Sequence, residues 1–245
     1  MYLWNVIGIS FLAGISTPLG GWFVLRFRHL SMRMMTTLLG MAAGIMITVI
    51  LTELMPTSLS AGSHELFLLG FTSGWLLMWG LKKSLGQLHK AEKLTNDKGA
   101  YLRMGWFIAI AITIHDLPEG LAIGAGDAVE HHVGLFIALA IALHNIPEGM
   151  SIAAPLRLGG MAKAQVFWIT LLTGLITPLG TIIAVWLFTI SHAFIALSLA
   201  FASGAMAFVV AQDIFPEAWR LDKLTTLAGV CLGSALMIAM TLLHF

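Results

Sequence analysis

The sequence predicts an all-α integral membrane protein with eight transmembrane helices, and three observations carry this prediction. Of its 245 residues, 58% are hydrophobic and only 10% are charged, whereas a soluble domain carries about 25% charged residues. The apolar residues form long uninterrupted runs, and a transmembrane helix needs about 20 of them. No run alternates apolar and polar residues as a membrane β-strand does. We therefore expect a single membrane domain over residues 1–245.

Eight hydrophobic segments follow one another along the chain, and eight spans use roughly 160 residues. They cover residues 3–25, 34–56, 65–81, 104–126, 133–156, 164–189, 193–216 and 225–244. Each is expected to be helical, because a backbone in lipid must satisfy its hydrogen bonds internally. The first segment contains no Lys or Arg up to residue 25, so it lacks the charged region of a signal peptide. The longest polar stretch, residues 82–103, is expected to be a surface loop.

The basic residues predict how the spans are oriented. All 13 Lys and Arg residues fall in the loops after the first, third, fifth and seventh segments, and the other loops and both termini contain none. The positive-inside rule makes the loops with Lys and Arg cytoplasmic. We therefore expect a multi-pass protein of the cell (inner) membrane, with a cytoplasmic loop at residues 82–103 and both termini outside the cytoplasm.

An internal repeat relates segments one to three to segments six to eight at an offset of 160 residues. The matching residues are Thr17-Pro18-Leu19-Gly20 with Thr177-Pro178-Leu179-Gly180, Gly44 with Gly204, Glu53 with Asp213, and Pro56 with Pro216. Five segments separate the starts of the two copies, and this odd number gives the copies opposite orientations. Inverted repeats of this kind are typical of secondary transporters, whose substrate site lies near the midplane.

Two similar motifs occupy the segments between the two copies. They read His115-Asp116-Leu117-Pro118-Glu119-Gly120 and His144-Asn145-Ile146-Pro147-Glu148-Gly149. Each begins about 12 residues into its segment, near the bilayer centre, where ionisable residues are costly and normally functional. Within each motif, His and Glu are four residues apart and share a helix face. Each proline removes a backbone donor and frees a carbonyl one turn earlier.

Two imidazoles with three carboxylates suit a borderline divalent ion such as Zn²⁺, Fe²⁺, Mn²⁺ or Cd²⁺. Three other interpretations stay open. The motifs could form a polar network that only joins helices, the site of a metal-dependent hydrolase, or a haem site with His115 and His144 as axial ligands. Against the last two stand the absence of H-E-x-x-H and the neighbouring carboxylates. A net charge of +1 excludes a basic nucleic-acid surface, and the single Cys231 excludes an intrachain disulfide.

At these motifs the sequence resembles the ZIP (Zrt/Irt-like) family of divalent metal transporters, and it looks like the short prokaryotic members. The resemblance covers nearly the whole chain. It implies a 3+2+3 bundle in which spans 4 and 5 hold the metal. It also implies transport of zinc, or of iron, manganese or cadmium, toward the cytoplasm by alternating access, with the repeats rocking against the rest. The ion is then the substrate, with no enzymatic activity and no catalytic cofactor. The implied partners are metal ions and the bilayer, and a homodimer stays open.

The resemblance also assigns site residues. The metal ligands it implies are His115, Asp116, Glu119, His144, Asn145, Glu148 and Met46. The pathway candidates are Glu53, Asp213 and Thr177, and the inverted repeat gives each vestibule one of the two acids. Many ZIP members carry a Glu where this chain has Thr177. We therefore expect one tightly bound ion and a weak or empty second position.

Overall fold

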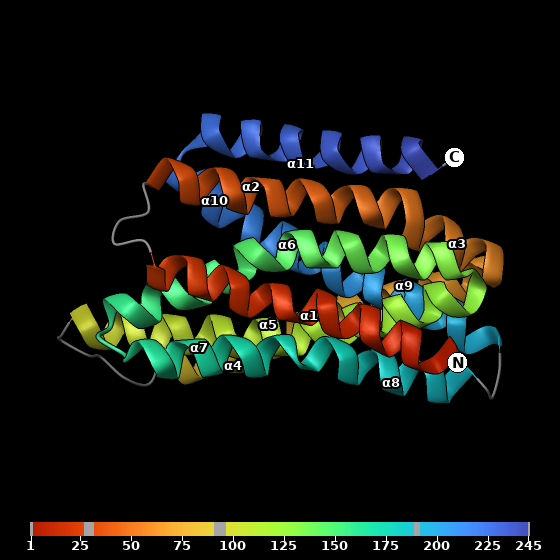
Figure 1. Cartoon of the computed structure of the whole chain (residues 1–245), viewed down its shortest axis with the longest axis horizontal. Helices are drawn as coiled ribbons and strands as arrows, with labels where there is room; N and C mark the ends of the chain where they lie inside the picture. Colours follow the sequence, from red (N-terminus) through yellow and green to blue (C-terminus); the bar gives the residue numbers. More distant parts are fainter. Residues whose placement is uncertain (1, 27–31, 91–96, 189–191, 245) are drawn as a thin grey trace.

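The computed structural model describes residues 2–26, 32–90, 97–188 and 192–244, and the only regular elements in these ranges are helices. They are α1 (Tyr2–Arg26), α2 (Met32–Val49), η1 (Ile50–Leu54), α3 (Met55–Ala61), α4 (His64–Lys90), α5 (Asp97–Val129), α6 (His131–Leu158), α7 (Lys163–Gly174), α8 (Ile176–Phe188), α9 (His192–Val209), η2 (Val210–Ile214), α10 (Phe215–Leu221) and α11 (Lys223–His244). Here η1 and η2 are π-helices. The helices run along the long axis of the molecule, and both chain ends lie at one end of it (Figure 1).

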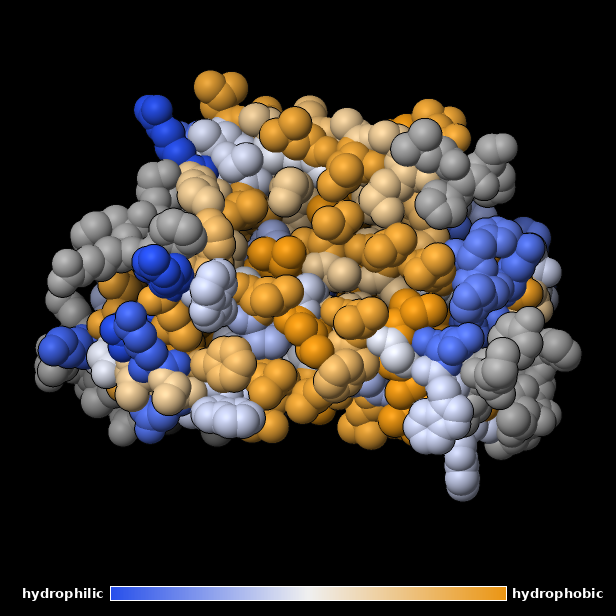
Figure 2. Space-filling view, in the orientation of Figure 1, coloured by the Kyte–Doolittle hydropathy of each residue, from blue (hydrophilic) through white to orange (hydrophobic). Residues whose placement is uncertain are grey.

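In the described part of the chain, 7 helical segments are long and apolar enough to cross a membrane. Helix α4 has 27 residues, which is long enough, but its Gly, Thr, Ser and Trp residues lower its hydropathy. Because both termini lie at one end (Figure 1), the number of crossings is even, and α4, packed along α9, completes eight. Hydrophobic residues form a broad band across the middle, with hydrophilic residues at both ends (Figure 2). The all-α membrane fold is confirmed, and the 3+2+3 grouping stays a prediction.

One expectation about the loops was wrong. Residues 82–103 do not form a loop throughout, because α4 continues to Lys90 and α5 already begins at Asp97. Lys, Leu and Gln, which dominate residues 82–90, are good helix formers. Hydropathy shows where the apolar stretch stops, whereas the helix continues into the aqueous phase.

The repeat is visible as matching irregularities. The π-helices η1 and η2 occupy residues 50–54 and 210–214, which are related by the 160-residue offset. Each precedes a proline, Pro56 or Pro216, and contains one acid. The copies differ elsewhere: α1 passes Pro18 without interruption, whereas the sixth span is broken at Leu175. Both prolines crowd the carbonyl of a glycine one turn earlier, Gly14 or Gly174, so the proline alone does not explain why only the sixth span is broken.

Glycines set the contacts between the repeats and the two central helices. A Cβ atom added at Gly149 of α6 would overlap the carbonyl oxygen of Thr17 in α1, and one at Gly120 of α5 would overlap that of Thr177 in α8. The sequence motif Pro-Glu-Gly therefore serves a packing role as well, because only glycine permits this approach. Each central helix is thus fitted closely to the helix of one repeat, and Thr17 and Thr177, the repeat residues of the two contacts, are related by the 160-residue offset.

Candidate metal site

Helices α5 and α6 bring one imidazole and two carboxylates together. Ligand atoms of Glu119, His144 and Glu148 all lie within 4.8 Å of one another. The relative exposures of these residues are 0%, 0% and 2%, respectively. Glu119 stands at the middle of the span Ile108–Val129. The two motifs therefore meet on neighbouring helices, and that these residues bind a metal ion stays a prediction.

A short contact in this cluster joins the two helices. Nε2 of His144 lies 2.6 Å from Oε1 of Glu119, the distance of a strong hydrogen bond in which the two groups share a proton. A metal ion binds only deprotonated ligands. An ion bound between these atoms would therefore take the place of the shared proton.

The other residues of the two motifs have different surroundings. Asp116 is fully buried on α5, one turn before Glu119. When the Asn145 amide is oriented to face acceptors with its nitrogen, it donates to Oε2 of Glu148 at 3.3 Å and to the carbonyl of Ile141 at 3.2 Å. Asn145 therefore holds the Glu148 carboxylate in place. The side chain of His115 lies outside the described part of the structure.

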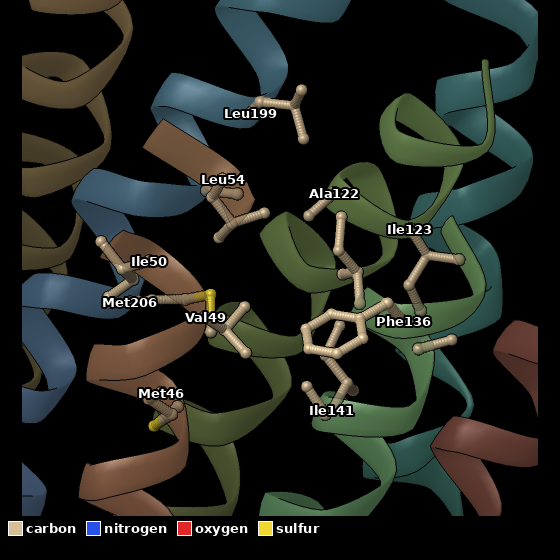
Figure 3. Close-up of a cluster of buried hydrophobic side chains, with 14 of the residues drawn as sticks. Met46, Val49, Ile50, Leu54, Ala122, Ile123, Phe136, Ile141, Leu199 and Met206 are labelled. Carbon is tan, nitrogen blue, oxygen red and sulfur yellow. The ribbon is translucent and has the colours of Figure 1, made fainter. Parts of the chain in front are cut away.

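An apolar cluster closes the site on the side of the chain termini. It combines residues of α2, η1, α5, α6 and α9, among them Val49, Leu54, Ile123, Phe136, Ile141, Leu199 and Met206, whose side chains converge (Figure 3). On α5 and α6 these residues lie between the carboxylates and the helix ends near the termini. Met46, expected as a ligand, is fully buried and belongs to this cluster.

Toward the opposite end, which carries the basic residues and is called the basic end below, hydroxyl groups accompany a smaller apolar cluster. Oγ1 of Thr113 in α5 lies 3.4 Å from Oγ1 of Thr173 in α7, and Oγ of Ser151 in α6 donates to the carbonyl of Glu148. Ile112, Ile152 and Val166 pack around them. Buried hydroxyls, among them those of Thr48 and Ser203, also occur on the side of the termini, so both sides of the site combine apolar and hydroxyl side chains.

Thr177, the position of the expected missing carboxylate, is fully buried on α8. Its hydroxyl has no hydrogen-bond partner among the described residues, and the same holds for Thr17. The two threonines occupy equivalent positions of the repeats, and their carbonyls touch the glycines that follow Glu119 and Glu148. Thr177 therefore contacts α5 directly after Glu119, and Thr17 contacts α6 directly after Glu148.

The two candidate pathway acids lie in the π-helices. Glu53 of η1 is half-buried. Oδ1 of Asp213 in η2 is 2.7 Å from Nζ of Lys82 in α4, and the same Nζ donates to the carbonyl of Gln212 at 2.6 Å. Sequence reasoning missed Lys82. One signal was available, since Pro216 cannot donate to the carbonyl four residues earlier, that of Gln212, and this free acceptor needs another donor.

The profile of the family described as ZIP Zinc transporter matches residues 81–241. This range contains both motifs. The chain belongs to the ZIP family.

Full-length ZIP relatives support the same assignment. The protein is 34% identical to Zinc transporter ZupT of Chlorobium luteolum, over 96% of each chain. It is also 34% identical to Zinc transporter ZupT of Xanthomonas axonopodis pv. citri, over 99% of this chain and 96% of the relative. A plant relative, Zinc transporter ZTP29 of Arabidopsis thaliana, is 33% identical over 87% and 84% of the two chains. These names are those of transporters and not of enzymes, and the resemblance seen in the motifs is confirmed.

Proposed function

We propose that this ZIP protein moves divalent transition-metal ions across a membrane, with zinc as the principal substrate and iron, manganese and cadmium as further substrates. The observation that carries the proposal is the trio Glu119, His144 and Glu148, buried at the middle of two membrane-spanning helices. His115, Asp116 and Asn145 complete the proposed site, and Met46 of α2 is proposed as a further ligand.

The charge of the trio favours a cation as its partner. Burying one carboxylate away from water costs several kcal/mol unless a positive charge compensates it. Two carboxylates meet here with a single imidazole, so the site is anionic unless protons or a metal ion neutralise it. Oxygen and nitrogen ligands together suit zinc and its neighbours. A purely structural network would not need this excess of acid.

An intramembrane hydrolase is the competing proposal. It would use the same ligands to activate water, and it needs an open coordination position and a separate general base. Glu119 and Glu148 are both proposed as metal ligands, so neither of them is left as a separate base. The names of the ZIP relatives are also those of transporters.

We further propose an orientation with the basic end in the cytoplasm, both termini outside it, and transport directed inward. The positive-inside rule supports this assignment, and the apolar cluster then closes the outer side. In a Cys231→Ser background, an impermeant thiol reagent applied to intact cells should label cysteines at Asp127 to His132 and spare those at Lys90 to Lys98. The reverse pattern contradicts the orientation.

The decisive experiment measures zinc flux into proteoliposomes. Glu119→Gln and Glu148→Gln keep the size of the side chain but remove the negative charge, and each should reduce flux at least tenfold, because one charge-assisted ligand contact is worth about 1.5–3 kcal/mol. His144→Ala should have a similar effect. Glu130→Gln is the matched control, since Glu130 is an exposed acid at the end of the same helix pair.

Two outcomes would count against the proposal. Unchanged flux in Glu119→Gln at matched protein amounts would remove the site from the pathway. Zinc-dependent hydrolysis of ester or peptide substrates, lost in the same variants and accompanied by no flux, would favour the hydrolase.

We also propose that the site holds one ion tightly. Asp116, Glu119 and Glu148 supply three negative charges against the four positive charges of two dications, whose mutual repulsion is large in a low-dielectric interior. Thr177→Glu adds a fourth negative charge and should raise the number of tightly bound zinc ions from one to two. Equilibrium binding on purified protein measures this stoichiometry, with Thr17→Glu as the matched variant in the other repeat. Two tight ions in the unmodified protein would contradict the proposal.

A further inference from the structure

A groove at the basic end lies apart from the candidate metal site. It has a volume of about 370 Å³ and lies between the last turns of α1 and the first turns of α7. Its walls come from Trp22, Leu25 and Arg26 of α1, and from Lys163, Phe167 and Trp168 of α7. Its size lies within the range of about 300–1,000 Å³ that is usual for small-molecule sites.

The packing of the two helices explains why a groove opens here. Closer to the midplane, α1 and α7 meet at Gly21 and Thr170, where an added Cβ atom would lie only 2.8 Å from Oγ1 of Thr170. Beyond this contact the helix surface of α7 carries the small residue Ala164. A small side chain opposite Leu25 leaves the space between the helices unfilled.

The residues of the groove combine three kinds of chemistry. Its interior is apolar, as acyl chains require. Trp22 and Trp168 flank it and are 52% and 58% exposed, and tryptophan concentrates at the level of lipid headgroups. Arg26 and Lys163 stand at its aqueous end, and neither forms an ion pair with an acid in the described ranges. Two uncompensated positive charges over an apolar groove complement a ligand with an anionic head and apolar tails.

We propose that this groove, formed by α1 and α7, binds an anionic phospholipid. The phosphate of the headgroup lies between Arg26 and Lys163, and the upper part of an acyl chain fills the groove over Ala164 and Phe167. Basic pockets between transmembrane helices at the membrane surface recognise lipid headgroups in this way. Bound there, the lipid joins α1, whose Thr17 touches α6, to α7.

The test is lipid binding to the purified full-length protein, followed by native mass spectrometry. Phosphatidylglycerol and phosphatidylcholine with identical acyl chains are the two probes. The unmodified protein should retain phosphatidylglycerol in preference to phosphatidylcholine. Arg26→Gln and Lys163→Gln should each weaken phosphatidylglycerol binding about fivefold, and together about 25-fold. Lys223→Gln, an exposed cation at the same end, is the matched control and should change nothing.

A second variant tests the groove itself. Ala164→Phe fills the apolar space while both cations remain, and it should weaken phosphatidylglycerol binding without creating a preference for phosphatidylcholine. Equal binding of the two lipids to the unmodified protein would overturn the proposal. So would phosphatidylglycerol binding that survives the double variant, or displacement of the lipid by inorganic phosphate at equal concentration, because a phosphate site does not require the groove.

Discussion

The π-helices η1 and η2 share one backbone irregularity, but different side chains surround them. In η2 the carboxylate of Asp213 and the carbonyl of Gln212 both receive Nζ of Lys82, which comes from the other repeat. In η1 the carboxylate of Glu53 has no Lys or Arg partner among the described residues. Ser63 and Asp222, which cap the first turns of α4 and α11, are 159 residues apart, and at this offset the counterpart of Lys82 is Thr241. Its hydroxyl donates to the carbonyl of Met237 in its own helix.

This difference teaches that the repeats have kept a common backbone while their chemistry has diverged. The backbone symmetry follows from proline and glycine, which act through main-chain geometry. The charge asymmetry follows from one side chain, Lys82. It neutralises Asp213, the acid nearer the basic end, whereas Glu53, nearer the termini, stays available to ions. As a pathway residue, Glu53 is therefore the stronger candidate, and both roles stay predictions.

The largest expected effect tests the backbone symmetry. Gly120→Ala and Gly149→Ala each place a Cβ atom on a carbonyl of the neighbouring helix, and overpacking of this kind costs about 1–3 kcal/mol. Each should lower Tm by about 3–10 °C, and the two should do so by similar amounts. Gly8→Ala is the control, since a Cβ there meets nothing within 4 Å. A tolerated change at one position alone would show that the two contacts are not equivalent.

A smaller effect tests the charge asymmetry. Lys82→Met removes the partner of Asp213, and the side chains of the pair are each 38% exposed. Solvent screening therefore limits the contribution to about 0.5–1 kcal/mol, or about 2 °C in Tm. A double-mutant cycle with Asp213→Asn isolates it. Lys83→Met, whose ammonium lies over the ring of Trp79, is the control. A coupling of zero would show that the ion pair with Lys82 adds no stability to η2.

The smallest effect concerns the caps of the third span of each repeat. Asp222 accepts the N–H of Thr225 at 2.9 Å, and Ser63 accepts that of Leu66 at 3.3 Å. The hydrogen bonds from Thr225 hold the pKa of Asp222 below its usual 3.8. The ionised Asp222 carboxylate therefore contributes its full stability above pH 3.8, the usual pKa. This contribution is lost as the pH falls through the lowered pKa of the folded protein. Tm measured against pH should therefore fall slightly more steeply for the unmodified protein than for Asp222→Ser, and parallel curves would contradict this.

The sequence determined the spans, the repeat and the motif residues well, because hydropathy and short motifs are local properties. It did not reveal the π-helices. Pro56 and Pro216 signal a disturbance in the helix, but a kink, a break and a π-turn all relieve the same clash, and only packing selects one. The contact of Lys82 with Asp213 spans 131 residues and needs the tertiary fold. The contact of Asn145 with Glu148 could not be predicted either, since side-chain orientation depends on the neighbours, and its role as a ligand stays a prediction.

The glycine contacts also decide which helices travel together. Gly14 of α1 and Gly174 of α7 press against each other's carbonyls, so the first and sixth spans meet directly. This contact and those at Gly120 and Gly149 pack five helices closely around the carboxylates, and these helices form one block: α1, α5, α6, α7 and α8. The pairs α2 with α11 and α4 with α9 lie outside it. A displacement that carries an ion across the membrane therefore keeps the coordination sphere intact if the block moves as a whole, and opens it if the block comes apart.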